Sequence, residues 1–235
     1  MGYSSAADIP YAVVEERTFI HRVYGWMTGG LIVTALIALF TAATPALIKP
    51  ITESRGLFFG LIIGELIVVM ALSASIQRIS PFAAGIGFVF YAVLNGLTLS
   101  IVFVAFELGS IYSAFFVTAG TFGAMSLYGY TTKRDLTSIG NLCGMALFGL
   151  ILAMLASFIF PGLRGPGASL IINGLGVLIF VGLTAYDTQK IKAYHRLGRD
   201  GSDADKKAAI MGALRLYLDF INLFLFMLRL MGRRR

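Results

Sequence analysis

The chain has 235 residues, of which 57% are hydrophobic and only 13% are charged. Soluble domains carry about 25% charged residues, so this composition indicates an integral membrane protein. The net charge of +7 comes from basic residues in the predicted connections and at the ends of the chain rather than from a repeated basic motif. This distribution favours anionic lipid head groups over nucleic acid as the partner. Cys143 is the single cysteine, which excludes a disulfide framework and a cysteine-based metal site.

The order of polar and apolar stretches predicts one membrane domain. Residues 1–21 are polar and lack the apolar core of a signal peptide, so we expect a cytoplasmic N-terminal segment there. A single transmembrane domain follows over residues 22–231, and residues 232–235 form a basic tail. Its seven apolar segments are each long enough to cross a bilayer, and short connections predict antiparallel neighbours. The predicted spans are 22–44, 56–79, 82–106, 110–130, 138–160, 168–192 and 207–231.

The distribution of Lys and Arg predicts the orientation. The N-terminus and the connections after the second, fourth and sixth spans carry 11 basic residues, against three in the other connections. Because basic residues concentrate on the cytoplasmic side, the N-terminus is predicted to be cytoplasmic. The tail disagrees with this rule, since Arg229 and residues 233–235 lie outside if the last span crosses fully. The length of the span favours a full crossing, and the alternative is a last segment that crosses incompletely.

The last span carries polar residues where a lipid-facing helix would be apolar. Arg215, Asp219 and Asn222 follow a 4-then-3 spacing and therefore share one face of a helix. A carboxylate in the middle of a span is costly in hydrocarbon, so Asp219 is expected to face protein or water. This pattern predicts a last helix surrounded by other helices.

A second acidic residue, Asp187, lies in the sixth span. Asp187 and Asp219 are equally far from residue 203 in the intervening turn, so an antiparallel hairpin places them at similar depth. Two facing carboxylates in a poorly solvated site tend to share a proton, which makes a proton-sensitive latch. In a purely structural alternative, Arg215 neutralises Asp219 within the helix, while Asp187 lies at the membrane interface beside Lys190.

Other polar residues within the spans carry weaker signals. Glu65 near the middle of the second span is either an ion or proton site or a hydrogen-bonded structural residue. In the third span, Tyr91, Asn95 and Thr98 form a polar stripe that serves interhelical hydrogen bonding or lines a pore. No H-E-x-x-H, P-loop, G-x-S-x-G or C-x-x-C pattern occurs, so hydrolase and nucleotide chemistry have no motif to support them.

Three segments resemble the signatures of the Bax inhibitor family, also called the transmembrane Bax inhibitor motif or YccA-like family. They are SLYGYTTKRDL at 126–136, FVGLTAYDTQKIK at 180–192 and LRLYLDFINLFLFMLRL at 214–230. The resemblance covers nearly the whole chain, and the short termini resemble those of a bacterial member, which implies the inner membrane as the location. It further implies a seven-helix bundle with the C-terminal helix at its centre, wrapped by three helical hairpins.

The resemblance also implies a function, a pH-sensitive calcium leak. In this family two aspartates on the last two helices act as the pH sensor, and Asp187 and Asp219 match those positions. An acidic residue and an arginine of helix two are tied to the sensor or the pore, and Glu65 and Arg78 are the nearest candidates. Because Ca²⁺ prefers oxygen ligands, Asp187 and Asp219 are also candidate contacts for the transported ion. We expect no cofactor and a monomer, with Asn95, Arg215 and Asn222 as supporting polar or pore residues.

Two other functions compete with the leak. A non-transporting regulator would bind a membrane-bound AAA protease or stress and cell-death proteins, as relatives are described to do, although no partner surface is visible in the sequence. An intramembrane aspartyl protease also carries a Tyr-Asp pair on its sixth helix, which Tyr186–Asp187 fits. However, Asp219 lacks the preceding Gly-x-Gly, and the Pro-Ala-Leu at Pro45–Leu47 comes before the aspartates rather than after them. We therefore expect no enzymatic activity.

Overall fold

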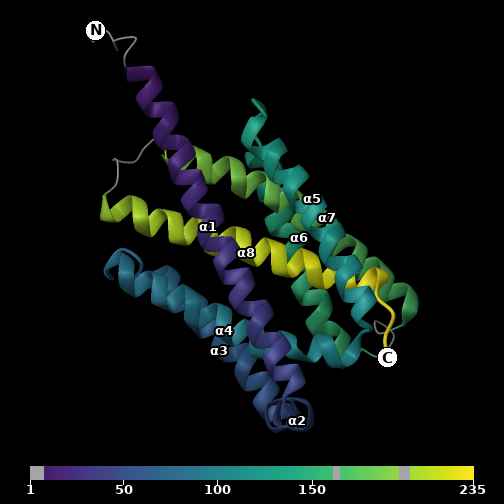
Figure 1. The fold of residues 1–235 in the computed structure, drawn as a ribbon. Coiled ribbons are helices and arrows are strands. Elements are labelled where there is room, and N and C mark those ends of the chain that lie inside the picture. Colours follow the sequence, from purple (N-terminus) through teal and green to yellow (C-terminus); the bar gives the residue numbers. More distant parts are fainter. Residues whose placement is uncertain (1–7, 161–164, 196–201) are drawn as a thin grey trace. The chain divides into compact units, whose positions relative to one another are not determined.

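The computed structural model describes residues 8–160, 165–195 and 202–235, and this part of the chain is almost entirely helical (Figure 1). Seven of the helices are long and apolar enough to cross a membrane, as the hydropathy pattern predicts. The helices are α1 (Asp8–Ala43), α2 (Pro45–Glu53), α3 (Arg55–Ser75), α4 (Pro81–Ala105), α5 (Leu108–Thr131), α6 (Thr137–Ile159), α7 (Pro166–His195) and α8 (Asp203–Met231).

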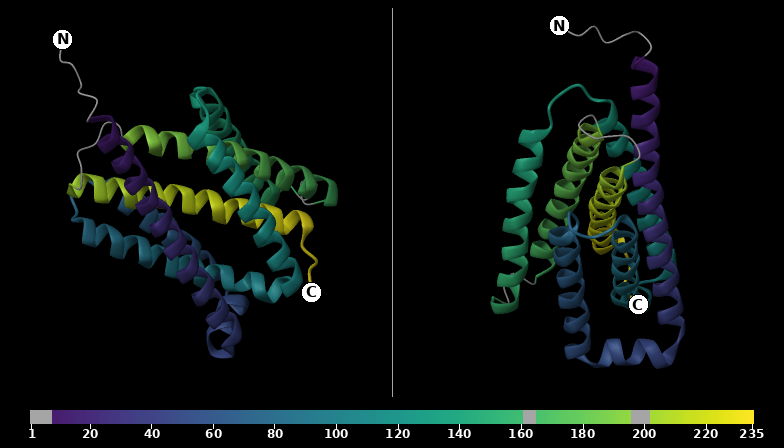
Figure 2. Two further views of the ribbon diagram at one scale, coloured as in Figure 1. Left: turned by 45° about the horizontal axis from the view of Figure 1, so that its top comes forward. Right: turned by 90° about the vertical axis from the view of Figure 1, so that its left-hand side faces the viewer.

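Helix α2 was not predicted. It occupies the expected connection between the first two spans and lies across the ends of α1 and α3 (Figure 2). Pro45 stands in its first turn, where the missing N–H has no helical acceptor in any case. Ser54 separates α2 from α3, and its hydroxyl accepts a hydrogen bond from the backbone N–H of Leu57 at 3.2 Å, which caps the start of α3.

Several helix boundaries differ from the predicted spans; helix α8, for example, begins at Asp203 rather than at residue 207. Helix α1 begins at Asp8, inside the segment 1–21 that was expected to precede the first span. Helix α3 ends at Ser75 rather than at residue 79, because the chain turns before Pro81 and Ser80 caps the next helix through a 3.2 Å bond from the N–H of Ala83. Arg78 therefore lies in a turn and not within the second span.

The chain divides into two compact units that cut across α4, α7 and α8. The first unit comprises Met1–Ile101 and Ile191–Tyr217, and the second comprises Val102–Lys190 and Leu218–Arg235. Each unit is described separately below, and statements about side chains concern only the described part of the chain.

Close helix packing in the second unit depends on residues without side chains. A Cβ atom at Gly129 of α5 would clash with the backbone of Ala185 on α7, and one at Gly140 of α6 would enter the ring of Tyr186. A Cβ at Gly182 would lie 2.5 Å from the sulfur of Cys143. These glycines let α5 and α6 approach α7 closely.

Helix α8 is the most buried of the seven spans. Within the apolar stretch that identifies each candidate span, 61% of the residues are buried in α8. The buried share is at most 39% in any other span, and it is only 6% in α3 and α6. The central position of α8 and its wrapping by three hairpins stay predictions.

The tail after α8 pairs with the connection between α4 and α5. The N–H of Glu107 donates to the carbonyl oxygen of Arg233, and the N–H of Arg235 donates to that of Ala105, both at 3.1 Å. The hydroxyl of Ser110 accepts a further bond from the N–H of Arg233 at 2.9 Å. The tail is therefore fixed against this connection by three hydrogen bonds.

Candidate functional site

The two aspartates predicted as the pH sensor both belong to the second unit. Asp219 on α8 is only 5% exposed, so its carboxyl group is enclosed by protein. Asp187 on α7 is half-buried. Both residues take part in polar or electrostatic interactions.

The residues of α7 and α8 that contact each other indicate how far along the helix pair the two aspartates lie. The rings of Phe180 and Phe226 stack with their centroids 5.8 Å apart and their planes at 27°. These two phenylalanines are equally far along the chain from residue 203, as are Asp187 and Asp219. Each aspartate lies about two turns from its phenylalanine and on the same helix face. The register thus supports the prediction that the two carboxyl groups lie at one level of the helix pair.

The segment of α7 that carries Asp187 is attached to the connection between α5 and α6. The side-chain amide of Gln189 donates to the carbonyl oxygen of Arg134 at 2.7 Å and accepts from the N–H of Leu136 at 2.9 Å. One side chain thereby satisfies two backbone groups that no helix would satisfy. The sequence analysis missed this role of Gln189, whose only signal is an amide beside the conspicuous Tyr-Asp pair.

The structural alternative for the two aspartates involves two cations, Lys190 and Arg215. The ammonium group of Lys190 donates to the hydroxyl of Tyr186 at 3.1 Å and lies 5.3 Å from the centroid of that ring. Arg215 belongs to the first unit, where its exposed side chain lines a pocket.

A second polar cluster surrounds Glu65 in the first unit. The half-buried carboxylate of Glu65 accepts hydrogen bonds from the amide of Asn95, at 3.2 Å, and from the hydroxyl of Thr98. The same amide also donates to the hydroxyl of Tyr91 at 3.5 Å. The polar stripe of the third span therefore makes the interhelical hydrogen bonds that the sequence suggested, with Glu65 as their acceptor.

Tyr217 and Thr34 continue this cluster onto α8 and α1. The hydroxyl of Thr34 donates to the carbonyl oxygen of Ala92 at 2.9 Å, so the hydroxyl of Tyr217, 2.7 Å away, is the donor in the bond between them. The ring of Tyr217 makes an edge contact with that of Tyr91, with centroids 5.8 Å apart. Sequence reasoning missed both residues, because a single Thr in an apolar helix gives no signal of its partner.

The remaining supporting residues, Asn222 and Arg78, make no hydrogen bond or ion pair with the aspartate pair or with the cluster around Glu65 in the described part of the chain. The amide of Asn222 donates to the carbonyl oxygen of Leu218 on its own helix at 2.9 Å. Arg78 is exposed in the turn after α3, beyond Ser75, the last residue of the helix; Ser75 is itself about 15 Å along the helix from Glu65 at 1.5 Å per residue. The expectation that Arg78 supplies an arginine within helix two is therefore wrong, because the helix ends before it.

Metal-ligating side chains do not gather into a resident site in the described part of the chain. No group of three or more His, Cys, Asp or Glu side chains converges there. Because Ca²⁺ takes six to eight oxygen ligands, an ion in contact with Asp187 and Asp219 would need backbone carbonyls, amides or water as well.

Comparison with known proteins places the chain in a family. A family model described as "Inhibitor of apoptosis-promoting Bax1" matches residues 16–235. The Inner membrane protein YbhL of Escherichia coli K12 is 48% identical, with the alignment covering 93% of each chain. A protein of Borreliella burgdorferi is 39% identical over 95% of each chain, and a membrane protein of Streptococcus pyogenes serotype M3 is 36% identical over 92% of each. With its seven candidate spans, the chain is a multi-pass membrane protein that belongs to the Bax inhibitor family.

Proposed function

We propose that this protein lets calcium ions leak across the membrane and that protonation of the Asp187–Asp219 pair controls the leak. The observation that supports the proposal is the stacking of Phe180 on Phe226, because these two residues are equally far from residue 203, as Asp187 and Asp219 also are. The burial of Asp219 adds to it, because an ionisable group inside a span is costly and is usually kept for a function.

The proposed gate is a shared proton. With one proton between the two carboxyl groups, an O–H···O bond joins α7 to α8. A change in pH adds or removes a proton, which breaks this bond and changes the local charge. The change in protonation therefore stabilises one arrangement of the helices relative to the other. Resting pH favours the closed arrangement, and acidification favours the open one.

The cluster around Glu65 supplies a second group of oxygens that suits a passing cation. Its carboxylate is accompanied by the hydroxyl of Thr98 and the side-chain amide of Asn95, and Ca²⁺ accepts all three kinds of oxygen as ligands. In this proposal Ca²⁺ is the transported substrate and is held only in passage. The scarcity of converging carboxylates in the described part is compatible with such weak, transient contacts.

The proposed location is the bacterial inner membrane with the N-terminus in the cytoplasm. The name of the Escherichia coli relative, an inner membrane protein, supports the membrane. The excess of basic residues on the N-terminal side, 11 against three in the other connections, supports the orientation.

Calcium flux into liposomes that contain the purified protein and an enclosed calcium indicator tests the proposal. Flux through the parent should rise on acidification, whereas Asp187→Asn and Asp219→Asn should each abolish or shift this dependence. Asp135→Asn is the matched control, because Asp135 is exposed in the α5–α6 connection. The hydroxyl and backbone N–H of Thr137 hold the pKa of Asp135 below its usual value.

Two results would contradict the proposal at different points. If both intramembrane variants respond to pH like the parent, the aspartate pair is not the sensor. If the parent carries no calcium at any pH, the leak itself is wrong and the non-transporting regulator becomes the better hypothesis.

A further inference from the structure

A groove of about 430 Å³ is formed by residues of α1 and α4 within the first unit. Its open part depends on Gly25 and Gly29 of α1, because a Cβ at either residue would meet no atom within 4 Å. At Gly30 the two helices are in close contact, since a Cβ there would lie 2.6 Å from the ring of Phe88. The apolar side chains that line the groove are those of Trp26, Val33, Phe88 and Val89. The groove therefore offers an apolar surface on which a hydrocarbon chain can lie.

Trp26 spans the contact between the two helices. A Cβ at Gly85 of α4 would lie 2.8 Å from its indole ring. The rings of Trp26 and Phe88 meet edge to face, with their centroids 6.0 Å apart. Trp26 is nevertheless 38% exposed, and it is the single tryptophan of the chain. Its fluorescence therefore reports on this groove alone.

Contacts between α1 and α4 show that Arg22 lies where the two spans begin. The contacting pairs are Trp26 with Gly85, Gly30 with Phe88 and Thr34 with Ala92. The residue numbers rise together along both helices, so α1 and α4 run in the same direction. Four residues before Trp26, Arg22 is therefore level with Pro81, the first residue of the α4 span.

The length of α1 agrees with this depth. Ala43 ends the helix 21 residues after Arg22, which is about 32 Å at 1.5 Å per residue and close to the thickness of a hydrocarbon core. Trp26 lies one turn further along, and tryptophan is enriched at membrane interfaces. The guanidinium group of Arg22 is thus at the level of the lipid head groups.

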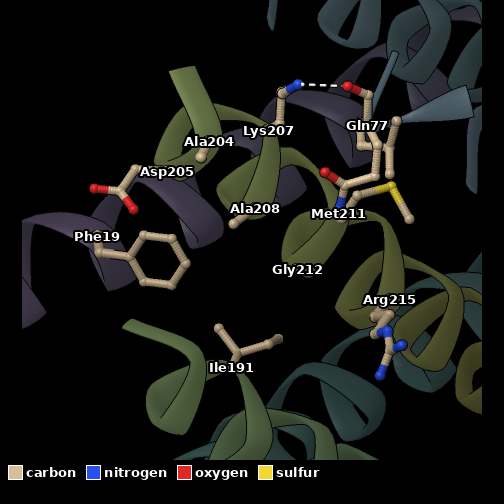
Figure 3. Close-up of a pocket in the computed structure, with 11 residues that line it drawn as sticks. Phe19, Gln77, Ile191, Ala204, Asp205, Lys207, Ala208, Met211, Gly212 and Arg215 are labelled. Carbon is tan, nitrogen blue, oxygen red and sulfur yellow. Dashed lines mark hydrogen bonds between the residues drawn. The ribbon is translucent and has the colours of Figure 1, made fainter. Parts of the chain in front are cut away.

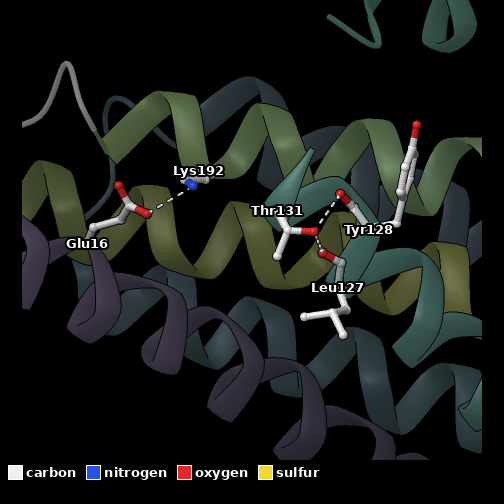
Figure 4. A network of polar contacts seen from close by, with 5 residues as sticks. All are labelled: Glu16, Leu127, Tyr128, Thr131 and Lys192. Atoms are coloured by element: carbon white, nitrogen blue, oxygen red, sulfur yellow. Dashed lines mark hydrogen bonds and ion pairs between the residues drawn. The ribbon is translucent and has the colours of Figure 1, made fainter. Parts of the chain in front are cut away.

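The charge of Arg22 is available to a ligand. Two nearby cations of the first unit already have partners: Lys192 pairs with Glu16 at 3.4 Å (Figure 4), and Lys207 donates to the carbonyl oxygen of Gln77 at 3.2 Å (Figure 3). The side chain of Arg22, in contrast, is exposed and makes no hydrogen bond or ion pair with any residue that the structure describes. Arg22 is also the charged residue among those that line the groove. The N-terminal end of the groove therefore carries a positive charge.

We propose that this groove binds an anionic phospholipid from the leaflet on the N-terminal side of the membrane. The guanidinium group of Arg22 binds the phosphate of the head group through charge-assisted hydrogen bonds. One acyl chain follows α1 from there over Gly25 and Gly29 to Val33, along the side of Trp26. A head group with a net negative charge is preferred, because no protein carboxylate lines the groove to neutralise Arg22.

A helix of a second copy of this chain is the competing occupant, since Gly25 and Gly29 have the spacing that is common at helix contacts in membranes. A symmetric pair places the same surface patch against itself. Such a pair would bring the two copies of Arg22 together with no anion between them. The charge at the end of the groove therefore favours a phospholipid.

Quenching of Trp26 fluorescence by lipids with brominated acyl chains tests the proposal. The full-length protein is reconstituted in phosphatidylcholine vesicles with an increasing fraction of brominated phosphatidylglycerol, or of brominated phosphatidylcholine with the same chains. Half-maximal quenching should need about fivefold less of the anionic lipid, which corresponds to roughly 1 kcal/mol, as expected for one basic residue near the surface. Arg22→Gln should lose this preference, and Arg22→Lys should keep part of it. Arg17→Gln is the matched control, because Arg17 is exposed on the same helix but does not line the groove.

A second pair of variants separates the head group from the acyl chain. Gly29→Leu fills the open part of the groove and should weaken quenching by both lipids. Unchanged quenching in this variant would show that the chain lies elsewhere. Should Arg22→Gln fail to fold, Gly25→Glu sets a carboxylate one turn from Arg22 and provides the same comparison. A lost preference is the expected result, and an unchanged one is the refutation.

Other outcomes would also overturn the proposal. Equal quenching of the parent by the two lipids, or the same loss of preference in Arg17→Gln as in Arg22→Gln, would show that the groove does not select the anionic lipid. Removal of the preference by millimolar inorganic phosphate would show a simple anion site. If neither lipid quenches Trp26 and the protein is a dimer, a second copy covers the groove instead.

Discussion

Replacement of Gly129 by alanine tests whether the close approach of α5 to α7 positions Asp187. A Cβ atom at residue 129 would lie 2.9 Å from the carbonyl carbon of Ala185 and 3.0 Å from its Cα atom. Carbon atoms in contact are separated by about 3.5 Å or more, and the carbonyl oxygen of Ala185 would lie closer still, so the two helices would have to move apart. No side-chain rotation relieves this clash, because the atoms that are met belong to the backbone.

The expected cost is at the upper end of the range for overpacking, about 1–3 kcal/mol. Ala185 is two residues before Asp187, so a displaced α7 carries the carboxyl group of Asp187 with it. We expect Gly129→Ala to lower the thermal unfolding temperature in detergent micelles. In the liposome assay it should also shift the pH at which calcium flux is half-maximal.

Gly123→Ala is the matched control on the same helix. No atom lies within 4 Å of a Cβ at residue 123, and alanine is favoured over glycine in a helix by up to about 1 kcal/mol. This variant should therefore be as stable as the parent or slightly more so. Equal unfolding temperatures for the two variants would refute the packing argument. A destabilised Gly129→Ala with an unchanged pH profile would refute the coupling to Asp187.

Three further changes test other contacts. Tyr217→Phe keeps the ring but removes the bond to Thr34, and should lower the free energy of unfolding by about 0.5–1.5 kcal/mol; combination with Thr34→Val should add little. Gln189→Glu replaces the amide that donates to the carbonyl oxygen of Arg134 with an oxygen. It should lower the free energy of unfolding in denaturant by about 1–3 kcal/mol, and an unchanged unfolding midpoint would contradict this hydrogen bond. Arg235→Cys, in a Cys143→Ser background, should react with a membrane-impermeant maleimide outside intact cells, and labelling only after permeabilisation would contradict the topology.

The features that the sequence predicted well depend on free-energy costs that arise within a single segment of the chain. Seven spans follow from hydropathy and length, because each must satisfy the bilayer by itself. The burial of Asp219 follows from the cost of a carboxylate in lipid. The ends of the helices were harder to predict, since they depend on turn chemistry such as the cap at Ser80 before Pro81. Arg78 was misplaced for that reason.

The composition of the polar clusters required knowledge of which helices are neighbours. The stripe that contains Asn95 was visible from helical periodicity, and Glu65 was visible as a lone acid in a span. Their hydrogen bond depends on the contact between α3 and α4, which the stripe alone does not specify. The bond between Thr34 and Tyr217 joins residues from the first and last spans, and no local pattern connects them.

The position of the tail bears on whether the last helix crosses the membrane completely. The tail is hydrogen-bonded to the α4–α5 connection, so the two lie on one side of the membrane. Three helices, α5, α6 and α7, separate that connection from the start of α8. If each of them crosses, α8 begins on the opposite side and must cross fully to bring its end back.

Four arginines then lie on the outer side against the positive-inside rule, namely Arg229 and residues 233–235. Added to the three basic residues of the outer connections they make seven, which is still fewer than the 11 on the N-terminal side. Two of the four also rest on aromatic rings, Arg229 at 5.7 Å from the centroid of Phe226 and Arg234 at 5.9 Å from that of Phe106. Cation–π contacts of this kind are worth about 0.5–1 kcal/mol at exposed sites. The basic tail is therefore compatible with seven full crossings and a cytoplasmic N-terminus.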